Sequence, residues 1–348
     1  MRIFKLYFNL IILKFIIFAS CSKDPCLSLF KDEKVIQSEI INFKDKFPLA
    51  NPFLLTKIDS FIILADVYDK KLFTIINLYD KNIYRFGRIG HGPGEFLIGS
   101  FVCGFNEKKD IYFYNPSFRK LYKANINNII KYTNYNPIEI LSFNKQNISK
   151  LDLINDSLFI VQGKFGNYRL VLLNNKGKIL DSTLQYPEYK KTINPIFYEL
   201  AFQGKVSVNS KSLKFVHITY KSSNIGFYKI INNKIVVIKE IFLKNPSMKL
   251  INLSGNIMTC LPDKNCIHGY LDVYTSNNFV YAIYNNKKVS EENNLLSSNV
   301  LVFDWDGKPI KILKLDKKVS FICASDDDSF IYAISYENEK INLLSYRL

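Results

Sequence analysis

The chain has 348 residues, of which 48% are hydrophobic and 22% charged, a composition that excludes disordered and collagen-like proteins. Its 28 Phe and 22 Tyr favour β-strands, and beyond residue 20 no apolar run reaches the roughly 18 residues that a membrane helix needs. The net charge is +16, but the lysines are spread along the chain and match no nucleic-acid-binding motif, so we expect no nucleic-acid partner.

Residues 1–20 have the layout of a secretory signal peptide, with a basic start, an apolar stretch and then small residues. The sequence Phe-Ala-Ser-Cys at 18–21 resembles a lipobox, the site at which bacterial lipoproteins are cut and acylated on cysteine. Acyl chains on Cys21 would hold the protein at a membrane. The alternative is an ordinary signal peptide followed by a cysteine without lipid.

The chain therefore divides into a signal peptide at 1–20, a lipidated tether at 21–32 and a folded domain at 33–348. The charged residues after Cys21 look like the short sorting signals of Gram-negative lipoproteins. We expect the protein to be anchored in the bacterial outer membrane, on its periplasmic face or at the cell surface.

Beyond residue 30 the chain is a series of short β-like runs broken by Asn, Asp, Lys and Gly, without a sustained helical period. The runs fall into groups of four that begin near residues 53, 98, 151, 202 and 266, followed by a group of three near 319. Units of about 50 residues with four strands each are typical of propellers. The sequence predicts an all-β fold, a six-bladed β-propeller of four-stranded antiparallel blades.

The last group is one strand short, because the chain ends there. Residues 35–43 partly alternate in polarity, and we predict that they supply the fourth strand of this blade. Such pairing would close the ring and cover strand edges that otherwise promote aggregation. Residues 185–199 are the least strand-like part, and we expect a short helix or a long loop there.

Two of the six cysteines, Cys260 and Cys266, enclose a turn-rich stretch. An exported chain can form disulfides, and these two residues are the best local candidates for one. Free thiols are the alternative. A metal site that includes His268 offers only three ligands in an unfamiliar spacing.

A glycine-rich loop follows the outer strand of the first predicted blade and brings Arg85, Arg88, His91 and Glu95 close together in sequence. Guanidinium and imidazole groups at one corner could hold a carboxylate or a sugar. The structural alternative is that the glycines permit a tight loop whose Phe96 fills the space before the next blade.

Catalytic motifs are scarce. The chain has three histidines and lacks the G-x-S-x-G signature of Ser hydrolases and the paired histidines of zinc hydrolases. The run of three aspartates at 326–328 matches no EF-hand spacing, so a solvated hairpin is the simpler interpretation. A Ca²⁺ or other divalent ion in a central channel would need oxygen ligands near the inner strands; the candidates are Asn51, Asp59, Glu199 and Asp272.

Three segments carry a family resemblance: GRIGHGPGEF at 87–96, VLVFDWDGKPIKILKLD at 300–316 and FIYAISYENEKINLL at 330–344. Together with the lipobox they resemble the TolB-like six-bladed β-propeller lipoproteins. The resemblance implies fold and location more than activity, and no catalytic residue carries over from it.

We therefore expect an exported, membrane-anchored lipoprotein whose monomeric propeller is a non-catalytic binding or scaffolding module for an envelope protein or glycan, without a cofactor. The alternative is a metal-dependent propeller enzyme, lactonase- or lyase-like, that acts on a small sugar or peptide.

Overall fold

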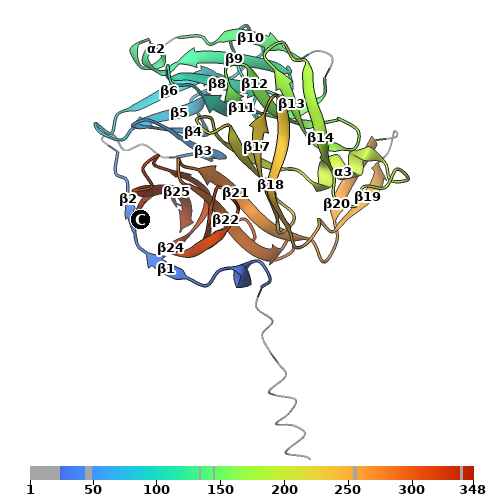
Figure 1. The fold of residues 1–348 in the computed structure, drawn as a ribbon. Helices are drawn as coiled ribbons and strands as arrows, with labels where there is room; N and C mark the ends of the chain where they lie inside the picture. Colours follow the sequence, from blue (N-terminus) through green and yellow to red (C-terminus); the bar gives the residue numbers. More distant parts are fainter. Residues whose placement is uncertain (1–23, 44–48, 133–134, 144–145, 254–256, 338–339) are drawn as a thin grey trace, which may run out of the picture.

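The computed structural model describes residues 24–43, 49–132, 135–143, 146–253, 257–337 and 340–348. Its strands form antiparallel sheets that are arranged radially, like the blades of a propeller (Figure 1). The predicted all-β class and the four-stranded antiparallel blades are thereby confirmed. The predicted signal peptide and Cys21 lie outside the described residues. Within those residues, no helix has the length and apolar character needed to cross a membrane.

Four sheets hold four strands each, in chain order. The first blade comprises β3 (Leu54–Ile58), β4 (Phe61–Tyr68), β5 (Lys71–Asn77) and β6 (Ile83–Arg88), and the second β7 (Phe101–Phe105), β8 (Asp110–Asn115), β9 (Lys120–Asn125) and β10 (Ile138–Ser142). The third comprises β11 (Ile148–Asn155), β12 (Leu158–Gly163), β13 (Tyr168–Asn174) and β14 (Ile179–Gln185), and the fourth β15 (Gly204–Asn209), β16 (Lys214–Thr219), β17 (Asn224–Ile231) and β18 (Lys234–Phe242).

The rest of the ring is one eight-stranded sheet. It contains β21 (Ile267–Thr275), β22 (Phe279–Lys288), β23 (Ser297–Asp304), β24 (Pro309–Ala324), β25 (Phe330–Glu337), β26 (Lys340–Arg347), β1 (Glu33–Ile36) and β2 (Ser38–Ile40). The long strand β24 joins two halves, because Leu313 pairs with Val300 of β23 while Ile322 pairs with Ala333 of β25. The group of three predicted near 319 therefore begins within a continuous strand, because β24 runs unbroken from Pro309 to Ala324.

The N-terminal residues add two strands to this sheet rather than one. β1 runs parallel to β24, and β2 pairs antiparallel with β26, where Ser38 lies opposite Tyr346. The amide of Ile41 extends the second pairing by donating to the carbonyl of Leu343 at 2.9 Å. The part of the predicted strand from residue 38 onward thus lies beside the last strand of the chain.

Residues 24–30, which we call the docked segment, pack against the propeller. Cys26 is fully buried with its Sγ 3.4 Å from the Tyr270 hydroxyl, and the Phe30 ring meets Phe303 edge-on at 5.1 Å. The short helix η1 (Leu27–Leu29) connects the two. The tether predicted up to residue 32 is therefore wrong from residue 24 onward, because Cys26 and Phe30 bury apolar surface in the core.

Aromatic side chains fill the space between the first two blades. Phe96 is fully buried, with ring centroids 5.3 Å from Phe73, 5.5 Å from Phe113 and 5.4 Å from Tyr122. The loop that precedes Phe96 is rich in glycine. Gly87 has a φ of +78°, and a Cβ at this position would lie only 2.8 Å from the Phe73 ring. The structure thus supports the structural interpretation of this aromatic residue.

We expect Phe96→Ala to lower the free energy of unfolding by about 3–5 kcal/mol, the usual effect of emptying a buried aromatic site. Guanidinium unfolding of the purified domain measures this change. The matched control is Phe330→Ala, because Phe330 is more than one-third exposed and should lose less than about 1 kcal/mol. Equal losses in the two variants would show that Phe96 is not a core residue.

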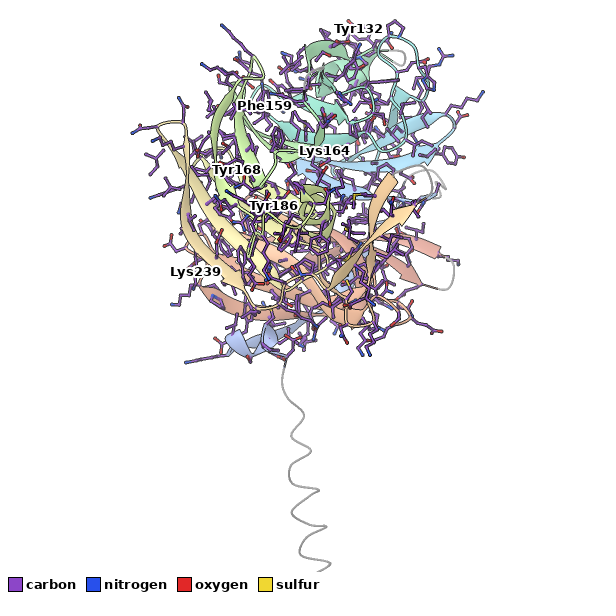
Figure 2. The ribbon with its side chains drawn as sticks, turned by 90° about the vertical axis from the view of Figure 1, so that its right-hand side faces the viewer. Tyr132, Phe159, Lys164, Tyr168, Tyr186 and Lys239 are labelled. Atoms are coloured by element: carbon purple, nitrogen blue, oxygen red, sulfur yellow. The ribbon has the colours of Figure 1, made fainter. Side chains whose placement is uncertain are left out.

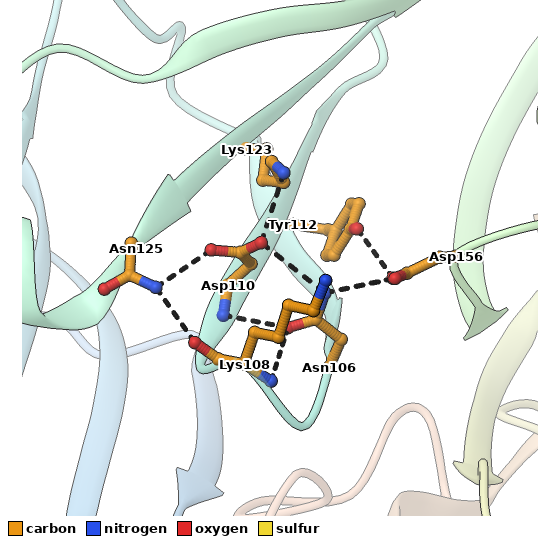
Figure 3. A network of polar contacts seen from close by, with 7 residues as sticks. All are labelled: Asn106, Lys108, Asp110, Tyr112, Lys123, Asn125 and Asp156. Carbon is orange, nitrogen blue, oxygen red and sulfur yellow. Dashed lines mark hydrogen bonds and ion pairs between the residues drawn. The ribbon is translucent and has the colours of Figure 1, made fainter.

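The turns between the first and second strands of neighbouring blades are clasped together (Figure 3). Asp156 accepts hydrogen bonds from the Tyr112 hydroxyl at 2.8 Å and from the Asn106 amide at 3.1 Å, both in the preceding blade. Within the turn of the second blade, Asp110 accepts from Asn125 at 2.9 Å.

The aspartate run at 326–328 makes the same kind of clasp. Asp328 accepts from the Tyr281 hydroxyl and from the Asn278 amide, each at 2.8 Å. Hydrogen bonds from Ser325 and Ser329 lower the pKa of Asp327 to about 2. These carboxylates thus belong to a hydrogen-bonded hairpin turn, in agreement with the expected hairpin.

Three excursions leave the regular pattern. α2 (Ile126–Lys131) follows β9, and α3 (Pro195–Ala201) lies within the stretch where a helix or a loop is predicted. The hairpin of β19 (Met248–Leu253) and β20 (Ile257–Pro262) packs beside α3 and is not predicted from the sequence. Figure 2 looks onto the end of the propeller that α3 covers, next to the buried Tyr186.

Candidate functional site

The first strands of the blades surround a central channel. They contact one another in a closed circle: β3 with β7, β7 with β11, β11 with β15, β15 with β21, β21 with β24, and β24 with β3. A cavity of about 170 Å³ lies between them. Its polar lining residues include Asp152, Lys205, Ser207, Asn209, Lys211, Thr275, Asn277 and Asp326. This cavity is the candidate site, because propeller ligands reach the inner strands most directly there.

A buried ion pair crosses the channel wall. The Lys205 ammonium lies 2.5 Å from Asp272 Oδ1, and Asp272 Oδ2 accepts a hydrogen bond from the Ile322 amide at 2.9 Å. One carboxylate therefore links β15, β21 and β24. Burial lowers the pKa of Lys205, but the Asp272 carboxylate outweighs burial and leaves this pKa raised, so the ammonium stays charged.

Asp152 is the second carboxyl group of the channel. It lies on β11, is partly buried and lines the cavity, and within the described residues its carboxylate has no hydrogen-bond donor. Burial raises its pKa to about 7, although Lys150 and Lys205 oppose this rise. The group thus changes charge near neutral pH and is free to accept a hydrogen bond from a ligand.

This raised pKa predicts a pH-dependent stability. Because the folded pKa is about 7 and the unfolded pKa about 3.9, the folded state keeps the proton longer. Protonation of Asp152 therefore favours the folded state at low pH, and this contribution to the free energy of unfolding is lost as the pH rises from about 4 to about 7. Because Asp152 is only partly buried, we expect Asp152→Asn to be more stable than the wild type by about 1–2 kcal/mol at pH 8 and equal to it at pH 4. Guanidinium unfolding at both pH values measures the difference, and a pH-independent difference would contradict it.

The mouth of the cavity is held by side chains that bond across blades. Ser207 and Thr275 share a hydrogen bond of 3.0 Å, and the Asn209 amide donates to the carbonyls of Ser276 and Asn277. Hydroxyl and amide groups predominate at this mouth. Such a rim suits a ligand rich in hydroxyl or peptide groups, because both partners can donate and accept.

The expected oxygen ligands for a channel metal do not converge. Of the four candidates only Asp272 lies within an innermost strand, β21, and there Lys205 already neutralises it. Asp59 pairs with Lys109 at 2.6 Å, and Glu199 lies on α3. Across the described ranges, no three His, Cys, Asp or Glu side chains are grouped as metal ligands would be. An ammonium in contact with the carboxylate does not suit a divalent cation.

The histidines do not form a nucleophilic site either. His217 is buried in β16, where burial lowers its pKa well below 6.5, and burial also lowers the pKa of His268. His91 is exposed beside the Phe118 ring at 5.8 Å. In the part of the chain that the structure describes, none of the three is hydrogen-bonded to a Ser, Thr or Cys side chain, and the buried His217 Nε2 has no partner.

The predicted binding loop is split between two environments. Arg88 and Glu95 lie 3.3 Å apart, and Glu95 also accepts from the Gly92 amide at 2.8 Å. A Cβ at Gly90 would lie 2.0 Å from Glu95 Oε2, so a larger residue there would displace this carboxylate. His91 lines a separate surface hollow of about 640 Å³. Ligand binding by this loop stays a prediction.

Arg85 points away from the other three. Its guanidinium bonds to Thr74, lies 3.7 Å from Asp66 and covers the Tyr68 ring at 4.5 Å. Asp66 is fully buried and also accepts from the Ala50 amide at 3.0 Å. Arg85 thus serves a buried polar cluster that sequence reasoning missed, since the two residues stand far apart in the chain.

The predicted disulfide is not formed, and Cys260 and Cys266 are free thiols in the structure. The Cys260 thiol donates to the carbonyl of Phe197 on α3 at 3.8 Å, whereas the Cys266 sulfur lies 3.8 Å from that of Met248. The two side chains therefore face different partners. Burial raises the pKa of both thiols, which disfavours the reactive thiolate.

Comparison with known proteins agrees with this architecture. The family model described as TolB-like 6-blade propeller-like matches residues 28–327. A Bacteroides fragilis structure described as a "putative exported protein" aligns with 13% identity and a TM-score of 0.55, over 94% of this chain and 97% of its own. A DUF4221 family member from Bacteroides vulgatus aligns with 11% identity and a TM-score of 0.55, over 91% and 97%. Among curated proteins, none matches this chain.

Proposed function

This chain belongs to the TolB-like 6-blade propeller-like family, and on that premise we propose that it is an exported lipoprotein whose propeller is a non-catalytic binding or scaffolding module for an envelope protein or glycan. Lipid on Cys21 holds it in the outer membrane. Support for export comes from the layout of residues 1–20 and from the name of the Bacteroides fragilis relative. Support for binding comes from the channel.

The proposal includes six blades closed by the N-terminal residues. The eight-stranded sheet counts as two blades that share β24, and β2 supplies the outer strand of the last one beside β26. The closed circle of contacts among the first strands supports this count. Such closure leaves the last blade without an open edge.

The observation that carries the binding role is the chemistry of the cavity. Hydroxyl and amide groups surround its mouth. The Asp272 carboxylate is paired with Lys205, whereas the Asp152 carboxylate accepts no hydrogen bond within the described residues. Burial keeps His217 neutral, and among the residues that the structure describes it is not hydrogen-bonded to a Ser, Thr or Cys side chain. These groups can hold a polar partner, but they do not assemble a general base with a nucleophile.

Photo-crosslinking in living cells tests the binding role. A photoreactive residue replaces Lys211, an exposed side chain at the cavity. We expect a defined envelope protein or glycan to be crosslinked from this position and not from the control position Tyr132, which is exposed on α2's side of the molecule (Figure 2). Equal crosslinking from both positions, or none from Lys211, would contradict the proposed site.

We expect Cys21→Ser to release the protein from the outer-membrane fraction, because acyl chains each contribute ~0.8 kcal/mol per buried CH₂ and serine cannot receive them at this site. Fractionation of envelopes followed by immunoblotting measures the change. Cys26→Ser is the matched control, since Cys26 lies inside the core and is no lipid acceptor. Retention of the Cys21→Ser protein in the membrane would overturn the anchoring proposal.

A further inference from the structure

We propose that one rim of the propeller, the surface formed by Leu29, Lys239, Leu243 and Lys244, lies against an anionic lipid bilayer. We call this surface the anchor rim. The inference rests on the proposed lipidation of Cys21 and goes beyond it, because it assigns the orientation of the whole domain. A flexible tether would leave that orientation undefined.

The docked segment is bonded to the propeller from its first residue, Asp24. Asp24 accepts a hydrogen bond from the Tyr284 hydroxyl at 3.2 Å and one from the Cys26 amide at 2.7 Å. The Tyr284 hydroxyl also bonds to Ser223 at 2.8 Å. Asp24 is thus bonded to β22, through a tyrosine that also bonds the turn before β17, and this turn donates to the Lys244 carbonyl just after β18.

The second step is the length of the chain. Three peptide units separate Cys21 from Asp24, and fully extended they span at most about 11 Å. A lipid on Cys21 would therefore keep Asp24 within about one lipid headgroup layer of the membrane. The surface around Asp24 would therefore stay close to the membrane.

The third step is the chemistry of this rim. Leu29 and Leu243 are 38% and 41% exposed, so both present apolar surface to the solvent. Lys239 on β18 and Lys244, which follows Leu243 in the chain, are also exposed. Glu240 is the only acid of β18, and it is already bonded to Arg169. Apolar side chains flanked by unpaired lysines suit an anionic bilayer.

The fourth step is the place of this rim in the molecule. η1 and β1 lie on the outer edge of the disc in both views, opposite the edge that carries α2 (Figures 1 and 2). Contact at this edge directs both ends of the channel sideways, along the membrane plane. The cavity would then be open to partners that lie beside the protein on the membrane.

The single Trp of the chain allows a direct test. Trp305 is buried in the same core cluster as Cys26 and Phe30, so it reports on the anchor rim. The full lipoprotein is placed in phosphatidylglycerol-containing vesicles with dansyl-labelled headgroups, and energy transfer from Trp305 is measured. A double variant, Trp305→Phe with Tyr132→Trp, moves the donor to the opposite edge.

We expect transfer from Trp305 to be at least twofold stronger than transfer from Trp at position 132. A ten-residue Gly/Ser insert between Lys23 and Asp24, which adds about 17 Å of flexible reach, should lower transfer from Trp305 by a similar factor. The insert leaves every residue of the docked segment unchanged, so its result does not depend on the stability of the Trp305→Phe, Tyr132→Trp variant.

The double variant Lys239→Glu with Lys244→Glu should lower energy transfer from Trp305, relative to the native protein, on anionic vesicles. It should leave this transfer unchanged on zwitterionic vesicles. Equal transfer from the two edges, with the protein still sedimenting with the vesicles, would overturn the orientation alone. A native protein that fails to sediment with vesicles would overturn lipid anchoring, and the orientation with it.

Discussion

A chain that begins at Leu49 is expected to lose most of its stability. The removed residues include Cys26, Phe30, Ile36 and Ile41, all buried. Full burial of each such side chain contributes about 1.5–3 kcal/mol, so their loss amounts to about 6 kcal/mol or more. Domains are stable by only about 5–15 kcal/mol, so the shortened chain should be largely unfolded or aggregated. The loss also exposes the edges of β24 and β26.

Thermal and guanidinium unfolding compare this chain with one that begins at Asp24. Two neighbouring residues of β1 provide a matched control, because Ile36 faces the core whereas Val35 is 68% exposed. Ile36→Ala should lower stability by about 2–4 kcal/mol, and Val35→Ala by less than about 0.5. An unchanged melting temperature for the chain from Leu49 would show that the N-terminal strands do not close the ring.

Lys205→Met is expected to lower the free energy of unfolding by about 3–5 kcal/mol. The substitution leaves the Asp272 carboxylate, which is only 1% exposed, without its counter-ion. Burial already raises the pKa of Asp272, and removal of the ammonium should raise it more. Since the folded state then holds a proton that the unfolded state releases above about pH 4, the loss should be small near pH 4 and should grow as the pH rises.

The double variant Lys205→Met with Asp272→Asn is the control. Asparagine keeps an acceptor for the Ile322 amide and carries no charge, so most of the stability should return. Unfolding free energies at pH 4 and pH 8 for the three proteins test this. If the single and double variants were equally unstable at pH 8, the loss would come from packing rather than from an unpaired charge.

The regular blades could be predicted from the sequence because each strand is short, apolar and ended by turn residues. The groups predicted to begin near 53, 151 and 202 coincide with the first strands β3, β11 and β15, which begin at Leu54, Ile148 and Gly204. The sequence also contains a repeated turn motif that could have predicted the contacts between blades. Asp-Ser followed by an apolar residue recurs at 59–61, 156–158 and 328–330, where the aspartates of the last two turns form the interblade clasps.

Other features depend on distant contacts that a local pattern does not contain. The polar stretch of Asp316, Lys317 and Lys318 looks like a turn, yet β24 continues through it because each half has a different partner strand. Lys205 resembles dozens of surface lysines in sequence, and only the ring geometry places it on Asp272. The short spacing of Cys260 and Cys266 suggested a bond, but the β20 hairpin directs one thiol to α3.

The measurement that tests the account most directly is the intact mass of the protein purified from native envelopes. We predict a chain that lacks residues 1–20 and carries acyl chains on Cys21. The docked segment would then begin within three residues of the lipid. A mass that matches an unmodified Cys21, or a chain that still starts at Met1, would contradict both the lipid anchor and the orientation that follows from it.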